Sequence, residues 1–163
     1  MSFGASFVPE FDHEMASTRR MIERVPSDRG PWKPHPKSFA LGHLAQLLSW
    51  MPGWIGSAVR DDSLDLEKSP KYSFETTETL LKDFDANVKS AREALQSATD
   101  EQMDQMWTLS RGNQVFMRVP KRFIVRNHMT HLSHHRGQMS VYLRLLDVPV
   151  PMVYGPTADE RMP

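Results

Sequence analysis

Cysteine is absent from this chain of 163 residues. No disulfide can therefore hold the fold, no thiolate can bind a metal, and any thiol chemistry needs an external thiol. An excess of one charge is also missing, since Lys and Arg together number 20 and Asp and Glu together number 20. This balance is not that of a polyanion-binding protein, so nucleic acid is not an expected partner.

A long, purely apolar run is lacking as well. Segment 39–59 contains no Asp, Glu, Lys or Arg, but His43, Gln46 and Pro52 are among the residues that make it too polar for a membrane span. The first residues lack the basic start and apolar stretch of a secretory signal. We therefore expect a cytoplasmic protein with no membrane partner, folded as a single domain over residues 1–163.

Charge is distributed unevenly along the chain. Acidic residues predominate between Asp61 and Asp104, whereas the segment from Gln105 to Leu146 contains no Asp or Glu. One interpretation is that an acidic helix packs beside a basic helix, with the charges paired between them. The alternative is a positive field that attracts carboxylate or thiolate ligands.

Four stretches have the apolar periodicity of amphipathic helices. They are expected over residues 7–25, from a cap at Ser38 to about residue 59 with a kink or an interruption at Pro52, from a cap at Ser73 to about residue 95, and from Pro120 to about residue 146. Segments 106–109 and 115–118 indicate a short hairpin or an irregular crossover. The predicted fold class is all-α, a four-helix bundle, with a tail after Pro149 that packs across it.

Histidine is concentrated in the last predicted helix, at positions 128, 131, 134 and 135. On a helix, His131 and His135 are separated by about 40° around the axis and about 6 Å along it, so both rings can share one ion. A third ligand is expected from another helix, because two imidazoles do not complete a stable site. His43 is the only histidine within the apolar pattern of the second helix.

The roles of the residues around this pair are interpreted from their positions on the same helix. His134 points about 100° away from His135 and is expected to face a neighbouring helix or the surface. His128 is either a pocket residue near the metal or a partly exposed histidine. Gln138 and Tyr142 either line a cavity or fill the bundle, and Gly137 is expected to permit close helix packing.

Three neutral imidazoles leave at least one coordination position open, which is typical of a reactive metal site. The residue after His131 is Leu132 and not glutamate, so the zinc peptidase motif is incomplete. The last predicted helix contains no carboxylate, and a general base would come from Asp12, His13 or Glu14, or from the substrate. Imidazole suits several metals, among which zinc or nickel are expected first, with iron or manganese as alternatives.

Four segments, 32–38, 41–44, 131–138 and 153–160, together resemble the DinB/YfiT-like family of metalloenzymes. The resemblance implies an up-down-down-up four-helix bundle with a divalent metal on His43, His131 and His135. Characterised members resemble transferases or isomerases that use low-molecular-weight thiols, which implies a small-molecule substrate, and the family also implies a homodimer. We therefore expect an enzyme that activates a thiol, as a thiol transferase, or water.

Two other functions remain open at this point. The first is a non-catalytic stress or structural protein in which the ion stabilises the bundle. The second is a metal-dependent hydrolase, whose rate would rise through the pKa of metal-bound water and would not respond to added thiol.

Overall fold

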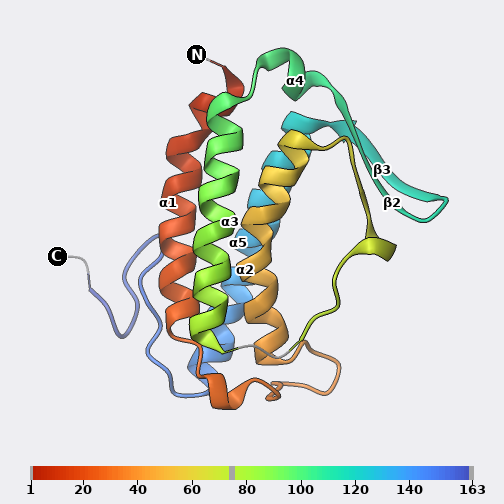
Figure 1. Cartoon of the computed structure of the whole chain (residues 1–163). Coiled ribbons are helices and arrows are strands. Elements are labelled where there is room, and N and C mark those ends of the chain that lie inside the picture. Colours follow the sequence, from red (N-terminus) through yellow and green to blue (C-terminus); the bar gives the residue numbers. More distant parts are fainter. Residues whose placement is uncertain (1, 74–75, 162–163) are drawn as a thin grey trace.

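A computed structural model describes residues 2–73 and 76–161 (Figure 1). Over these ranges the chain forms five α-helices, two short 3-10 helices and a three-stranded sheet. The elements are α1 (Phe3–Glu23), η1 (Ser27–Arg29), α2 (Leu41–Arg60), β1 (Ser63–Asp65), η2 (Leu66–Lys68), α3 (Thr77–Ser97), α4 (Asp100–Asp104), β2 (Met106–Arg111), β3 (Gln114–Pro120) and α5 (Lys121–Leu145).

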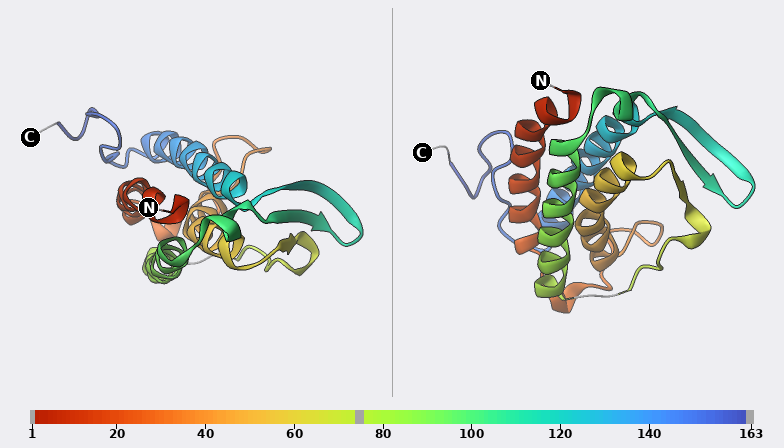
Figure 2. Two further views of the ribbon diagram at one scale, coloured as in Figure 1. Left: turned by 90° about the horizontal axis from the view of Figure 1, so that it is seen from above. Right: turned by 45° about the horizontal axis from the view of Figure 1, so that its top comes forward.

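The four long helices α1, α2, α3 and α5 lie side by side, and α1 and α5 run opposite to α2 and α3 (Figure 1). Helix α2 packs on α3 and α5, and α3 packs on α1. The β2–β3 hairpin extends from one side of these helices, and the C-terminal tail lies on the opposite side (Figure 2). None of the helices in the described ranges is both long and apolar enough to cross a bilayer.

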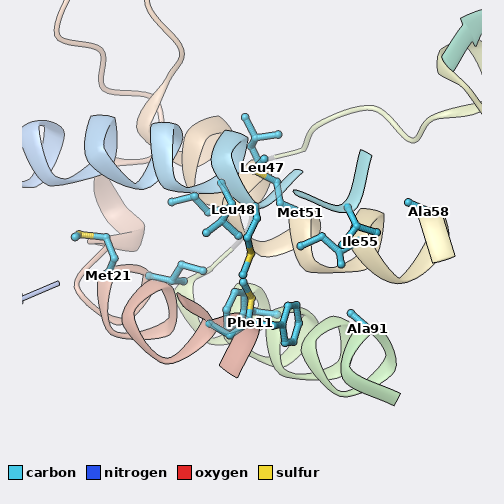
Figure 3. Close-up of a cluster of buried hydrophobic side chains, with 14 of the residues drawn as sticks. Phe11, Met21, Leu47, Leu48, Met51, Ile55, Ala58 and Ala91 are labelled. Carbon is cyan, nitrogen blue, oxygen red and sulfur yellow. The ribbon is translucent and has the colours of Figure 1, made fainter. Parts of the chain in front are cut away.

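The hydrophobic core lies between the long helices (Figure 3). Phe11 of α1, Leu48 and Met51 of α2, and Ala91 of α3 are completely buried there. These residues occupy the inward positions of amphipathic helices, whose periodicity is readable in the sequence. The core therefore fixes α2 and α5 next to each other, and these two helices carry all the predicted metal ligands.

The sheet corrects the prediction of an all-α chain. Strands β2 and β3 are antiparallel and form the predicted hairpin, with Gly112 at a φ of 54° in the turn. Strand β1 pairs with β2 in parallel and was not predicted. It has only three residues, which is too short for an alternating pattern to be recognised.

Helix α2 begins at Leu41 and has Ala40 as its N-cap, so the prediction of a cap at Ser38 was wrong. The proline-rich loop before the helix supplies the missing acceptors. The amide of Leu41 donates to the carbonyl of Trp32 at 2.8 Å, and the amide of Gly42 donates to the carbonyl of Gly30 at 2.9 Å. Because these carbonyls satisfy the first-turn amides, a capping side chain is not needed.

Helix α2 continues through Pro52 to Arg60, so the sequence-predicted interruption does not occur. Asn87 of α3 donates from its side-chain amide to the carbonyl of Ser49 at 3.0 Å, one turn before the proline. A Cβ on Gly53 would lie 2.9 Å from the Asn87 side-chain oxygen, so glycine allows α3 to approach here.

The cap of α3 is Thr76, whose hydroxyl accepts from the amide of Thr79 at 3.2 Å, and not Ser73 as predicted. Ser73 instead binds to α2, since its amide donates to the side-chain oxygen of Gln46 at 2.9 Å. This contact holds the segment before α3 against the face of α2 that includes His43.

The tail packs across the bundle as predicted and connects α1 with α5. Asp159 pairs with Arg144 of α5, and Glu160 pairs with Arg20 of α1. Two ion pairs join the acidic segment to the basic one, Lys121 with Asp62 at 2.8 Å and Arg122 with Asp104 at 2.6 Å, but neither involves α3. The acidic helix α3 instead pairs with α1, where Asp85 contacts Arg19 at 2.8 Å.

Candidate metal centre

The centre of the candidate site is a pair of imidazoles on α5. Because α5 is a continuous helix, His131 and His135 lie one turn apart, and their Nε2 atoms are 2.8 Å from each other. Two nitrogen ligands of a tetrahedral zinc ion, each about 2.0–2.1 Å from the metal, would be about 3.3 Å apart. The observed distance is that of a hydrogen bond between the two rings, and it is about 0.5 Å shorter than the spacing of two ligands, so the rings would have to separate slightly to share an ion.

Gln138 orients this pair. Its side-chain oxygen lies 2.8 Å from Nδ1 of His135, one turn further along α5. With the proton on Nδ1 donated to this oxygen, Nε2 of His135 is left as the unprotonated nitrogen. Metal-binding histidines normally donate their second ring nitrogen in this way. Gln138 is exposed and so does not fill the bundle, and its contact with His135 places it beside the histidine pair.

His43 reaches the same side of the bundle from α2. Its ring lies between Phe39, at a centroid distance of 4.5 Å, and Tyr72, at 3.9 Å. Phe39 is also 6.2 Å from the ring of His135. In residues 2–73 and 76–161, however, no three His, Asp or Glu side chains are grouped closely enough to hold an ion. The structure thus brings two of the predicted ligands together and leaves the third in an aromatic stack beside them.

The protonation of these rings suits metal binding. Burial is the main cause that lowers the pKa of His43, His131 and His135, and each is also lowered by a neighbouring positive charge. For His43 these charges are Lys33 and His135. The neutral form, which is the form that binds a metal, is therefore favoured near neutral pH.

His128 is buried, with an exposed fraction of 8%, which corrects the interpretation as a partly exposed histidine. Neither ring nitrogen has a hydrogen-bond partner, and burial lowers its pKa to about 4. The ring packs against Trp54 at 5.9 Å and Trp107 at 6.0 Å. His128 is therefore a neutral buried residue one turn before His131. His134 is exposed, with its ring 5.0 Å from that of His135.

Tyr142 is buried and supports the loop that leads into α2. Its hydroxyl donates to the carbonyl of Phe39 at 3.1 Å, and its ring meets Trp32 edge-on at 5.6 Å. It thereby fixes the position of Phe39, which contacts both His43 and His135.

The α1 residues predicted as general bases are engaged elsewhere. Asp12 pairs with Arg92 of α3 at 3.0 Å. Glu14 pairs with the buried Arg136 at 2.5 Å and accepts a hydrogen bond from Tyr154. His13 is exposed on α1. The structure records no contact of these three residues with the histidine pair.

Aromatic residues form much of the surroundings of the site, and sequence reasoning missed their role. Trp54 lies 6.3 Å from His131, and Tyr72 stacks on both His43 and Trp50. A cavity of about 550 Å³ opens beside these three aromatic residues. The four-residue spacing of Trp50 and Trp54, which places both on one face of α2, was the signal that could have found them.

These features define a helical protein whose histidines, contributed by two adjacent long helices, lie beside an aromatic cavity. The chain belongs to the DinB family, whose model matches residues 2–162.

Two solved structures share the fold. A DinB-like protein from Bacillus subtilis has a TM-score of 0.69 at 18% identity, with 96% of this chain and 99% of that chain covered. A DinB-like protein from Bacillus cereus has a TM-score of 0.70 at 24% identity, with 91% of this chain and 95% of that chain covered. A comparison with curated proteins finds no match.

Proposed function

We propose that the chain is a metal-dependent enzyme of the DinB type, with a divalent cation held by His43, His131 and His135. The observation that carries this proposal is the pair of facing Nε2 atoms, 2.8 Å apart, with Gln138 bound to the second nitrogen of His135. Imidazole is a good ligand for zinc and nickel, and these are the metals that we propose. Family membership supports the same site.

When bound, such a cation would hold a thiol as its thiolate or lower the pKa of a bound water. His131 is exposed to solvent, so a small molecule can reach the ligand face of α5. Gln138 keeps His135 in one orientation, and the rings of Phe39 and Tyr72 shield His43. These residues bind and orient, and none of them is a carboxylate.

Thiol transfer is the reaction that we propose. A thiolate attacks an electrophile without help from a base once its proton has been lost, whereas water attack usually needs a positioned base. The predicted bases on α1 are engaged in ion pairs or exposed on the surface. The arrangement therefore favours a thiol as the nucleophile over hydrolysis.

Metal content of variants tests the site. Protein purified without a histidine tag is loaded with zinc or nickel and analysed by elemental analysis. The His131→Ala variant is expected to lose at least about ten-fold in metal affinity, because one of three ligands is removed. His134→Ala is the matched control on the same turn and should keep the stoichiometry. Equal losses in both variants would contradict the proposed ligand set.

Assays of the metal-loaded protein test the reaction. Turnover of an electrophile that requires both an added small thiol and the metal supports thiol transfer. A metal-dependent rate that is insensitive to thiol supports hydrolysis instead. Metal binding with no turnover of either kind would support a stabilising role for the ion.

A further inference from the structure

We infer that the cavity beside Trp54 is a binding site for a planar aromatic ring that carries no negative charge. The cavity has a volume of about 550 Å³ and lies between α2 and the segment that carries β1 and η2. Sites for small molecules have volumes of this order and are lined mainly by apolar and aromatic groups. That the ring is part of the enzyme's substrate rests on the proposed function, whereas the binding itself does not.

Three aromatic side chains make the cavity suited to a flat ligand. Trp50 and Tyr72 are stacked at 4.8 Å with an angle of 23° between their planes. Trp54 lines the same cavity from the next turn of α2. A flat ring gains stacking or edge-to-face contacts with such residues beyond the burial of its area, and an aliphatic group of equal size does not.

The same residues connect the cavity with the histidines. Tyr72 stacks on His43 at 3.9 Å, and Trp54 lies 6.3 Å from the ring of His131. Both residues also line the cavity. A ring bound there would therefore lie beside the histidine cluster, separated from it by no more than the side chains of Trp54 and Tyr72.

The charged groups at the cavity oppose an anion. Two carboxylates, Asp61 and Asp65, and one ammonium, Lys68, line it. The ammonium is already 3.9 Å from a carboxylate oxygen of Asp65. An anionic ligand would meet no unpaired cation among these lining groups and would be repelled by the remaining carboxylate. The cavity therefore selects rings that are neutral or positively charged.

Indole and indole-3-acetate are suitable probes because they share a ring and differ in charge. Titrations into metal-free ¹⁵N-labelled protein, in which no metal ion can bind the acetate group, are followed through the indole N–H resonances of the four tryptophans. Indole is expected to shift the resonances of Trp50 and Trp54 and to leave that of Trp107, which is only 2% exposed, unchanged. Indole-3-acetate should bind about five-fold more weakly, because of the repulsion.

Two variants locate the binding. Trp54→Leu and Tyr72→Leu are each expected to weaken indole binding about ten-fold, since one aromatic contact is lost. Phe116→Leu is the matched control, because this residue is 48% exposed and lies on the β2–β3 hairpin. Circular dichroism melting establishes that each variant is folded before it is titrated. If Trp54→Leu does not fold, Tyr72→Leu carries the test alone. Tyr72 is partly exposed, so its replacement is expected to disturb the fold less.

The outcomes separate this inference from the proposed metal site. His131→Ala should lose metal and still bind indole. Indole shifts that are absent at millimolar concentration, or that are unaffected by both leucine variants, would overturn the inference while leaving the metal site standing. Equal affinity for both probes would also overturn it, because the selection by charge would then be absent.

Discussion

At the scale of single residues, the candidate site depends on imidazoles that are kept neutral and held in one orientation. Burial lowers the pKa of His43, His131 and His135 and so favours the form that can bind a metal. Orientation is provided by one amide, that of Gln138. These two effects can be tested separately.

The first prediction concerns Gln138. Replacement by alanine removes the acceptor for Nδ1 of His135 and is expected to weaken metal affinity about 10-fold to 100-fold. Zinc affinity is measured by competition with a chromophoric chelator. Asn127→Ala, an exposed change on the same helix, is the control and should leave affinity unchanged. Unaltered affinity in the Gln138 variant would show that His135 does not need this bond to bind.

The second prediction concerns His128 and pH. Its pKa is about 4 in the folded protein and about 6.5 when unfolded, so the unfolded state binds more protons between these values. The contribution of the neutral His128 ring to the free energy of unfolding should therefore be fully present above about pH 6.5. It should decrease as the pH falls towards 4. The contribution of this one residue is about 3 kcal/mol.

Urea unfolding of metal-free protein at pH 4.5 and pH 7 measures this effect. In His128→Leu the difference in stability between the two pH values should be about 2–3 kcal/mol smaller than in the parent chain. The comparison between pH values removes the effect of the changed packing, which is common to both. His13→Gln, at an exposed position, should keep the full difference. If His128→Leu also keeps the full difference between pH 4.5 and pH 7, His128 is not a buried ring that stays neutral in the folded protein.

At the scale of elements, a buried ion pair joins α1, α5 and the tail. Arg136, only 2% exposed, contacts a carboxylate oxygen of Glu14 at 2.5 Å and the hydroxyl of Tyr154 at 2.5 Å. The hydroxyl of Thr18 accepts a further hydrogen bond from Arg136 at 3.1 Å. This cluster lies one residue beyond His135 and fixes the rotation of α5 about its axis.

The third prediction follows from this ion pair. Glu14→Gln leaves the charge of Arg136 buried without its counterion and is expected to destabilise the fold by about 3 kcal/mol. The double variant Glu14→Leu with Arg136→Met should recover most of that loss, because no buried charge remains. Urea unfolding measures both. Asp12→Asn, in the solvent-exposed pair with Arg92, is the control and should cost less than about 1 kcal/mol.

The fourth prediction compares two helical glycines. Gly137 has no atom within 4 Å of an added Cβ, which corrects the expectation that it permits close packing. Gly137→Ala should raise the free energy of unfolding by about 0.5–1 kcal/mol. A Cβ on Gly4 would lie 2.2 Å from the carbonyl oxygen of Leu95 in α3, so Gly4→Ala should lower it. Equal effects of both substitutions in a urea titration would contradict the conclusion that Gly4, and not Gly137, is needed for close helix packing.

The existence of the long helices was predictable because each buries one face in a regular pattern. The start of α5 at Pro120 was predicted as well, but the starts of α2 and α3 were not, because contacts distant in sequence engage the groups around Ser38 and Ser73. The carbonyls of Gly30 and Trp32 replace a cap at Ser38, and Gln46 binds the amide of Ser73. Strand β1 escaped prediction for the same reason, since its partner β2 lies more than forty residues further along the chain.

At the scale of the whole molecule, the predicted site could be assembled only in part. The pair His131 and His135 follows from helical spacing alone and is close in the structure, with 2.8 Å between the two Nε2 atoms. The environment of His43 does not follow from spacing, because Tyr72 comes from a separate segment and stacks on it. Residues from distant segments are brought together by tertiary packing, which a pattern on one helix cannot show.

The fifth prediction uses the stability of the whole fold. The proposed ligands come from α2 and α5, so a metal held by both should bind the folded state and not the separated helices. Free metal at about 100 times its Kd should then raise the free energy of unfolding by about 2.7 kcal/mol. Urea unfolding with zinc and with a chelator measures the difference. At the same metal concentration His131→Ala, whose affinity is at least about ten-fold lower, should show a gain of about 1.4 kcal/mol or less, and His134→Ala should retain the full gain. A gain that survives in His43→Ala would mean that α5 binds the ion without α2, because a site confined to one helix needs no second helix in place.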